Sequence, residues 1–489
     1  MITADKKTTA ATHPDYEDSI GYLTTIRACM IGSPAIKKGG HLYLPHPSQI
    51  DKTSVPQIAR YNELLNGAEF DSYPDDTRRE ILGKMRIGDS IIEVPDKLNY
   101  LIDNIDGNGM ASDSAIEFAI NNVYQTKFHA LVIDFKGAPS DTAGMSKAEQ
   151  TALNARAVIK QYTRENIINW NFSKVNGVMQ LSFIQFRELG YKFDPETGSN
   201  EEEEKYLVLA LDENGYYYQA KYTQDETLST AEKDYQKIKM KPLDRLPVLF
   251  VADEEILNDS LPLQLGYLWG ICDATLARYR VSASYKETQR NIAPTIMTSG
   301  WKTGDLEIFT EANNGRSYIA TGAGAVNNMP EGITSEILSA SPEMMDYHWY
   351  FEQNEKKIKL MGGSVSNQGA AMTATEADIS ASKQNALMNT VADNAEDSFK
   401  RAIFWCGLFE GIYTFDTFDV AMKQIKIELP RDFATPKLSV EEAKEYREQV
   451  INSLLSREDY TDIMVTGGWY KKDAITLLAA IEESPPVTI

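Results

Sequence analysis

The sequence is poor in cysteine. Its 489 residues include only Cys29, Cys272 and Cys406, which lie far apart and form no Cys-x-x-Cys pair. The odd number and the wide spacing argue against a disulfide framework and against a zinc site. Because each cysteine stands among mostly apolar residues, we expect three buried thiols in a chain that folds in a reducing compartment.

Basic residues are also few. The chain has 49 lysines and arginines against 71 aspartates and glutamates, and its formal net charge is −22. A broad face that neutralises phosphates needs clustered Lys and Arg, so binding of nucleic acid over such a face is excluded. DNA itself is not excluded as a partner, because an acidic surface suits DNA that must pass without sticking.

Long apolar runs are absent, and no uncharged apolar segment is long enough to cross a bilayer as a helix. The first residues, MITADKKTTAATHPDYED, are polar and lack the apolar centre of a secretory signal. We expect residues 1–15 to form a flexible tail. The length predicts two or three structural modules.

Recognisable catalytic motifs are missing. The sequence has neither a G-x-x-x-x-G-K-[ST] phosphate loop nor a G-x-S-x-G nucleophile elbow. GAGAV at 322–326 lacks the third glycine of a dinucleotide fingerprint and predicts a tight turn. NIDGNG at 104–109 resembles half a calcium loop, but its twelfth position is Ala115 instead of Glu, so we expect a turn there. The sequence therefore predicts no enzyme activity, no metal and no cofactor.

The first half of the chain has mixed helix and strand patterns. Helical spacing covers residues 18–30, 56–66, 77–85 and 97–103, and KFHALVIDF at 127–135 predicts a strand. Between residues 140 and 260, runs of β-branched and aromatic residues predict further strands, with a hairpin turn at DENG, 212–215. The charge run EEEEK at 201–205 is interpreted as a solvated loop. The fold class is α+β.

The second half predicts long helices. A helix of about thirty residues begins near Leu261, with Leu265, Leu268, Cys272, Leu276, Tyr279 and Ala283 on one face, and ends before Pro294. Short β-like pieces follow: PTIMTSG, RSYIATG and TSEILSA. Ser341-Pro342-Glu343 then starts a second helix, which stops at Gly362-Gly363.

A soft loop separates this second helix from a much longer one. Thr373-Ala374-Thr375-Glu376 is a capping box that opens a helix of more than thirty residues, with Leu387, Val391, Ala395, Phe399, Ala402 and Cys406 on one face. A strand at 423–429 and small C-terminal helices, including 457–465 and 472–482, complete the predicted elements. A helix this long is typical of an elongated or radially packed assembly.

This order of elements resembles the portal, or head–tail connector, proteins of tailed bacteriophages. Local stretches are similar to one portal subfamily: YLP at 43–45, DGNGM, ENIINW at 165–170, LDENGYYY and RYRVSASYKETQRNIAPTIMTSG. The resemblance covers most of the chain from about Tyr16. It assigns residues 16–260 to an α/β wing, 261–293 to a first stem helix, 294–340 to a small β-rich clip, 341–360 to a second stem helix, 361–372 to a tunnel loop, 373–412 to the long helix behind that loop, 413–432 to a strand returning to the wing and 433–489 to a short helical crown.

The resemblance also implies a function and partners. Such subunits form rings of twelve at one capsid vertex of the virion, where double-stranded DNA passes during packaging and ejection without sequence-specific contacts. The implied protein partners are the major capsid protein, the packaging terminase and the head–tail adaptor. No membrane partner is implied, and the chain would be made in the host cytoplasm. Twelve copies would carry a formal charge of −264, which repels phosphate.

Two groups of residues are candidates for the DNA channel. The first is the uncharged tunnel loop with Gly362, Gly363, Ser364, Val365, Ser366, Asn367, Gln368 and Gly369. The second is a basic group on the first stem helix, Arg278, Arg280, Lys286 and Arg290. These basic side chains would contact phosphate intermittently, or would instead pair between subunits with acids such as Glu352 and Glu355. Another virion structural protein, such as an adaptor or tail component, and a soluble enzyme without a visible motif remain the alternatives.

Overall fold

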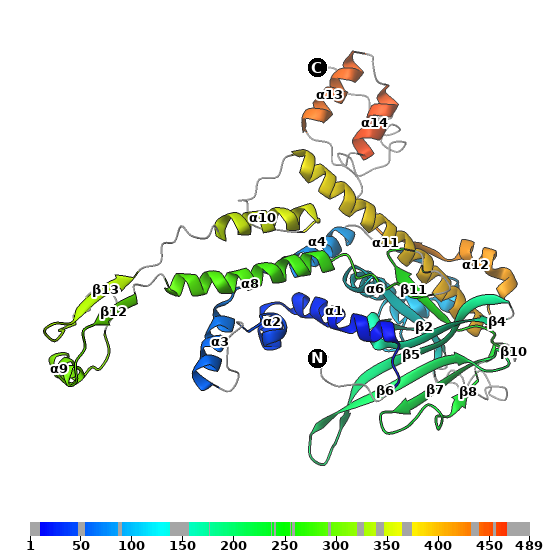
Figure 1. Cartoon of the computed structure of the whole chain (residues 1–489). Coiled ribbons are helices and arrows are strands. Elements are labelled where there is room, and N and C mark those ends of the chain that lie inside the picture. Colours follow the sequence, from blue (N-terminus) through cyan, green and yellow to red (C-terminus); the bar gives the residue numbers. More distant parts are fainter. Residues whose placement is uncertain are drawn as a thin grey trace. The chain divides into compact units, whose positions relative to one another are not determined.

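The computed structural model describes residues 10–46, 54–86, 90–136, 156–175, 177–235, 237–238, 241–254, 256, 260–291, 295–319, 327–338, 347–363, 374–431, 440–452 and 456–466. The chain is of the α+β class, as expected (Figure 1). It divides into two compact units. Unit 1 comprises residues 1–27, 77–269 and 375–489, and unit 2 comprises residues 28–76 and 270–374.

Antiparallel strands form the framework of unit 1. A three-stranded sheet has the order β11-β2-β3, a five-stranded sheet has the order β4-β5-β6-β7-β8, and the pairs β1-β14 and β9-β10 stand apart from them. The strands are β1 (Ile91–Glu93), β2 (Phe128–Lys136), β3 (Arg156–Thr163), β4 (Ile167–Val175), β5 (Val178–Phe193), β6 (Asn200–Leu211), β7 (Tyr217–Thr223), β8 (Lys233–Asp234), β9 (Lys237–Ile238), β10 (Lys241–Pro242), β11 (Val248–Ala252) and β14 (Lys426–Glu428).

Among the described residues, the helices wholly within unit 1 are α5 (Tyr100–Asp103), α6 (Ser112–Thr126), α12 (Phe418–Gln424), α13 (Val440–Ile451) and α14 (Arg457–Thr466), with 3-10 turns η2 (Asp96–Leu98), η4 (Arg164–Asn166) and η6 (Phe415–Thr417). Unit 2 contains α2 (Ser33–Gly39), η1 (Gly40–Leu42), α3 (Val55–Gly67), α9 (Asp305–Ala312), α10 (Tyr347–Leu360), β12 (Thr295–Ser299) and β13 (Thr334–Leu338). Four helices include residues of both units: α1 (Pro14–Ile31), α4 (Tyr73–Met85), α8 (Trp269–Asn291) and α11 (Ala374–Phe409).

The long helix α11 lies along the three-stranded sheet (Figure 1). Its Asn394 and Ser398 side chains donate hydrogen bonds to the carbonyls of Ala252 and Phe250 in β11, at 2.9 and 3.0 Å. The predicted apolar face is confirmed for Val391, Ala395, Phe399, Ala402 and Cys406, which are all buried. Side chains of this helix therefore both fill the core and satisfy carbonyls at the sheet edge.

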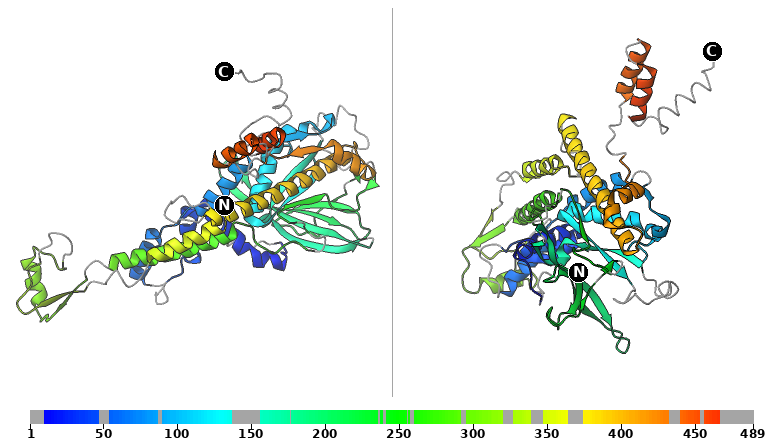
Figure 2. Two further views of the ribbon diagram at one scale, coloured as in Figure 1. Left: turned by 90° about the horizontal axis from the view of Figure 1, so that it is seen from above. Right: turned by 90° about the vertical axis from the view of Figure 1, so that its right-hand side faces the viewer.

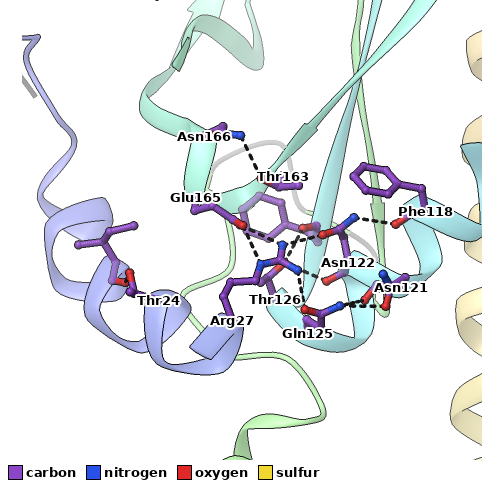
Figure 3. Close-up of polar contacts among 12 residues, drawn as sticks. Thr24, Arg27, Phe118, Asn121, Asn122, Gln125, Thr126, Thr163, Glu165 and Asn166 are labelled. Atoms are coloured by element: carbon purple, nitrogen blue, oxygen red, sulfur yellow. Dashed lines mark hydrogen bonds and ion pairs between the residues drawn. The ribbon is translucent and has the colours of Figure 1, made fainter. Parts of the chain in front are cut away.

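A cluster of polar contacts joins α1 to the rest of unit 1 (Figure 3). The Arg27 guanidinium forms an ion pair with Glu165 in η4 at 2.7 Å and donates to the side-chain oxygens of Gln125 and Asn122 in α6. Glu165 is the first residue of ENIINW, one of the stretches behind the portal resemblance. The ion pair between Glu165 and Arg27 joins η4 to α1. Both charges are largely buried, so each needs the other as a partner.

The N-terminal helix begins earlier than the sequence indicated. The expected flexible tail reached residue 15, but α1 starts at Pro14, and the His13 ring stacks on Trp170 at a centroid distance of 4.2 Å. The Thr12 hydroxyl also donates to the Glu17 carboxylate at 2.6 Å. These contacts involve Thr12 and His13, which lie on the N-terminal side of the predicted boundary. Residues 1–9 of the predicted tail lie outside the described residues.

The expected loop at EEEEK is wrong. Residues 201–205 belong to β6 and pair with 188–192 of β5 in regular antiparallel register. The charge run indicated solvation correctly, because Glu201 and Glu202 are exposed. The predicted backbone conformation was wrong, because a strand at the edge of the core can also carry side chains that point into water.

The first long helix starts later than predicted. It begins at Trp269, and residues 260–268 are not helical. Arg164 donates to the carbonyls of Gln264 and Leu263, and the Leu268 N–H donates to the Tyr124 carbonyl at 3.1 Å. These carbonyls and this N–H bond to other parts of unit 1, so the segment cannot use them for a helix.

Gly266 allows that segment to approach α6 closely. A Cβ atom at this position would lie 2.3 Å from the Gln125 carbonyl oxygen. Of the predicted helical face, Leu265 and Leu268 therefore precede the helix. Cys272, Leu276, Tyr279 and Ala283 lie within α8 and are buried.

The segment predicted as three β-like pieces contains a two-stranded hairpin and a helix. β12 pairs with β13, which confirms the first and third pieces, and the side chains of Trp301 and Phe309 pack edge to face beside them. Residues 316–319 of the middle piece are not in a strand, and α9 between β12 and β13 was not expected. Its short amphipathic sequence, DLEIFTEA, gives little helical signal on its own.

At the C-terminal end, the strand expected at 423–429 is confined to residues 426–428. It pairs with β1, within the segment assigned to the wing, and α12 occupies Phe418–Gln424. The helix at 457–465 is confirmed as α14, with α13 before it. The helix expected at 472–482 lies outside the described residues.

Candidate functional site

The basic residues proposed for the channel lie on α8, which packs side by side with α10 in unit 2 (Figures 1 and 2). The two helices run in opposite directions: the Thr288 and Tyr347 hydroxyls meet at 3.2 Å near one end, and Asn354 donates to the Ala274 carbonyl at 3.1 Å near the other. Tyr285 fills the interface between Tyr347 and Phe351. The pair is therefore held by both packing and hydrogen bonds.

Arg278 is the most enclosed of the four candidates. Its side chain is 14% exposed and forms ion pairs with Asp71 at 2.6 Å and Glu355 at 3.0 Å. It also donates to the Phe351 carbonyl at 3.1 Å and lies over the Phe351 ring. The guanidinium thus already holds two carboxylates and one carbonyl of its own chain.

Tyr73 completes this cluster. Its hydroxyl donates to the Glu355 carboxylate at 3.2 Å, and the Arg278 guanidinium lies 5.7 Å from its ring centroid. Burial raises the pKa of Tyr73 well above its ordinary value, and the nearby Asp71 carboxylate raises it further. The phenol is therefore neutral at every physiological pH and acts as a constant hydrogen-bond donor to Glu355.

The other basic residues are nearer to solvent. The exposed Arg280 donates through Nε to the Tyr43 carbonyl at 2.9 Å, and Lys286 forms an ion pair with Glu69 at 2.8 Å. Arg290 lies in α8, but its side chain is outside the described residues. The sequence suggests that the basic residues pair with Glu355 between subunits, whereas the structure shows Arg278 paired with Glu355 within one chain. The partners Asp71 and Glu69 were missed, because no sequence pattern connects residues about two hundred positions apart.

The start of the candidate tunnel loop is a defined helix stop. Gly362 has φ +82°, its N–H donates to the Lys359 carbonyl at 2.8 Å, and the Gly363 N–H donates to the Ile358 carbonyl at 2.9 Å. These two bonds form a Schellman motif, which requires a left-handed residue after the helix. A Cβ on Gly363 would lie 2.8 Å from the Ile358 carbonyl oxygen. Both glycines are thus needed where α10 ends.

The rest of the candidate loop, Ser364, Val365, Ser366, Asn367, Gln368 and Gly369, lies outside the described residues. The chain is described again from α11, which begins at Ala374, within the predicted capping box.

The possible calcium loop is occupied by its own backbone. Asn104 Oδ1 accepts a hydrogen bond from the Gly109 N–H, and Asp106 Oδ1 accepts from the N–H groups of Asn108 and Met110. Burial alone would raise the pKa of Asp106, but these N–H donors lower it below its ordinary value. Among the described residues, no cluster of His, Cys, Asp or Glu could hold a metal ion, and no helix could span a membrane.

The segment from α8 to α11 is similar to a known protein family. Residues 268–409 match a family model described as "Domain of unknown function (DUF4055)". These limits nearly coincide with the first residue of α8 and the last residue of α11. No curated protein matches the sequence.

Similar solved structures come from gene transfer agent (GTA) particles. One chain is from the "Virion of native gene transfer agent (GTA) particle", at 12% identity and a TM-score of 0.39. A second chain is from the "Neck of empty GTA particle computed with C6 symmetry", at 13% identity and a TM-score of 0.40. A third is from the "Neck of native GTA particle computed with C12 symmetry", at 12% identity and a TM-score of 0.39. Each match covers 83% of this chain and 92% of the other. TM-scores this low do not establish a common fold.

Proposed function

We propose that this chain is the subunit of a phage-type portal, a ring that forms the channel for double-stranded DNA at one vertex of a capsid. The observation that carries the proposal is the order of elements from α8 to α11. A helix, an insertion with β12, α9 and β13, a second antiparallel helix and a glycine stop precede a helix of 36 residues. The family model spans this same segment as one unit.

Within this proposal, α8 and α10 form the stem, the β12–β13 insertion forms the clip and the strands of unit 1 form the wing. The Arg278 cluster gives the stem a fixed internal structure. Arg280 and Lys286 are the described basic side chains of α8 that could meet passing phosphates, because both lie closer to solvent than Arg278. The net charge of −22 per chain would keep such meetings brief.

The candidate tunnel loop would narrow the channel between the Schellman stop and α11. Its residues from Gly362 to Gly369 carry no formal charge, so they would not hold phosphate. The proposed partners are further copies of the chain, the major capsid protein, the packaging terminase and a head–tail adaptor. Catalysis is not part of the proposed role, since the packaging motor would be a separate protein.

Negative-stain microscopy of the purified chain tests this proposal. Rings with twelvefold or thirteenfold symmetry and a central hole are expected, because the subunit must surround DNA. Assembly should be examined over a range of protein and salt concentrations, with and without a co-expressed capsid scaffold. A chain that stays monomeric under all these conditions would contradict the proposed function.

A further inference from the structure

A two-stranded hairpin extends beyond the core of unit 1. The ends of β5 and β6, residues 188–193 and 200–205, pair in continuous register and project from the five-stranded sheet (Figure 1). The burial of β5 ends near Glu188, and each residue from Leu189 to Phe193 is exposed. We call residues 188–205 the arm.

One face of the arm carries an apolar row on β5 beside polar residues on β6. Directly opposed residues in an antiparallel pair point to the same side, so three large apolar residues share a face with their partners on β6. The pairs on this face are Leu189 with Glu204, Tyr191 with Glu202 and Phe193 with Asn200. The opposite face carries Glu188, Lys192, Glu201, Glu203 and Lys205.

The apolar row on β5 is strongly exposed. Leu189, Tyr191 and Phe193 are 54%, 66% and 59% exposed. Three large apolar side chains in an unbroken row on one strand are not scattered surface residues but a patch, and such patches are typical of contact sites. The row is about 13 Å long at the usual rise of a strand.

A groove of complementary character lies elsewhere in unit 1. It has a volume of about 370 Å³ and lies between β11, the end of α11 and the segment that leads into α12. Four aromatic side chains and two arginines are among its lining residues: Phe404, Trp405, Phe415, Phe418, Arg245 and Arg401. Phe415 and Phe418 are 41% and 37% exposed, so the aromatic surface is accessible.

The charges of the arm and the groove are opposite. The arm has seven acidic and two basic residues, a formal charge of −5. Arg245 lies over the Phe415 ring at 4.7 Å, and Arg401 lines the same groove. Their acidic neighbours Asp244 and Asp397 do not line it, and ion pairs between such exposed side chains contribute little. Both guanidinium groups can therefore turn to a new carboxylate.

We propose that the arm of one copy docks into this groove of a second copy. Tyr191 and Phe193 would pack on the aromatic side chains, and Glu202 would approach Arg401. The occupant is a second copy because the arm continues the paired strands β5 and β6 and projects from the five-stranded sheet of its own chain (Figure 1). Two different surfaces that meet in this way form a heterologous contact, which builds a closed ring when the rotation between neighbours closes. The inference rests on the proposed ring and names the residues that would join its neighbours.

The first test compares association of three forms of the full-length chain. Tyr191→Ser with Phe193→Ser should raise the concentration at which half the chains are assembled by about 10-fold or more, because central aromatic residues dominate such contacts. The matched control, Lys192→Ala with Glu201→Ala, alters the opposite face and should leave assembly unchanged. Rings of unchanged stability in the serine variant would overturn the docking inference while leaving the proposed function intact.

Charge reversal and cross-linking test the partner surface. Glu202→Arg and Arg401→Glu should each weaken assembly, and the double variant should recover it. A photo-reactive phenylalanine analogue at Tyr191, in a mixture of light and isotope-labelled chains, should cross-link to residues 401–418 or 245–249 of another copy. Cross-links to another surface or within one chain would refute this contact. A wild-type chain that never assembles would refute both the contact and the proposed function.

Discussion

Arg278 of α8 and Glu355 of α10 form a largely enclosed ion pair, with 3.0 Å between the guanidinium nitrogen and the carboxylate oxygen. Asp71 binds the same guanidinium and the Tyr73 hydroxyl binds the same carboxylate. Four residues from three segments thus fix the two helices proposed as the stem. In the proposed channel wall, this cluster would supply internal stiffness without exposing positive charge.

Arg278→Met should destabilise unit 2. It leaves Glu355, whose side chain is 10% exposed, without its cationic partner, a change that typically costs about 3–5 kcal/mol. For a unit of this size we expect the melting temperature to fall by roughly 6–20 °C. Arg280→Met is the matched control on the same helix, and a fall of about 2 °C at most is expected. Equal effects of the two changes in thermal denaturation would show that the cluster is not a special support.

His129 should make stability depend on pH. It is fully buried, it contacts Gln161 at 2.8 Å, and burial lowers its pKa to about 4. The unfolded chain binds a proton near pH 6.5, whereas the folded chain does so only near pH 4. Stability from this group is therefore complete above pH 6.5 and is lost as the pH falls toward 4, by about 3 kcal/mol.

The His129 effect can be isolated by denaturant titrations at pH 7.5 and 4.5. The stability difference between these pH values should be smaller in His129→Gln than in the wild type. His348→Gln, which changes an exposed histidine, should keep the wild-type difference. An unaltered difference in His129→Gln would assign the acid sensitivity to other groups.

Gly266→Ala should disturb the approach to α8. The new Cβ would lie 2.3 Å from the Gln125 carbonyl oxygen and 2.6 Å from the Thr126 nitrogen, and backbone atoms cannot easily move aside. A loss of about 1–3 kcal/mol is expected, as in other overpacked sites. Gly83→Ala, within α4 with open space around its Cβ, should instead gain up to about 1 kcal/mol. Chemical denaturation of both variants checks the opposite signs.

Deleting residues 364–370 tests the proposed tunnel loop. The Schellman stop at Gly362-Gly363 and the start of α11 would remain, so we expect ring assembly to persist. DNA retention or packaging should fall, because the loop is proposed to act only on DNA in the channel. Microscopy of rings and a packaging assay separate the two effects. Loss of the rings themselves would make the loop an assembly element instead.

The sequence predicted elements best where local signals decide the backbone. The periodic pattern located α1 to within a few residues, and DENG marked the turn between β6 and β7. Prediction failed where distant parts of the chain decide. Residues 260–268 have a helical pattern, but contacts with Arg164 and Tyr124 hold them out of a helix. EEEEK looked like a loop because its strand partner in β5 lies outside any local window.

In the candidate site, too, local features could be predicted from the sequence and distant contacts could not. Gly362-Gly363 was recognisable as a helix stop, because glycine is the residue that most readily adopts the left-handed backbone that follows α10. The basic side chains of α8 were equally visible. The partners of these side chains could not be recognised in the sequence. Asp71 is 207 positions from Arg278, and no local sequence pattern indicates an ion pair over such a separation. Within one chain, the structure shows that Arg278 joins α8 to α10 and to Asp71.

The mass of the assembled protein tests the central claim most directly. Native mass spectrometry of the full-length chain should give a closed ring, with twelve copies of 54.8 kDa summing to about 660 kDa. A ring of thirteen would still agree with a portal. A monomer, a dimer or an open-ended series of masses at all protein and salt concentrations, with scaffold present, would contradict the account.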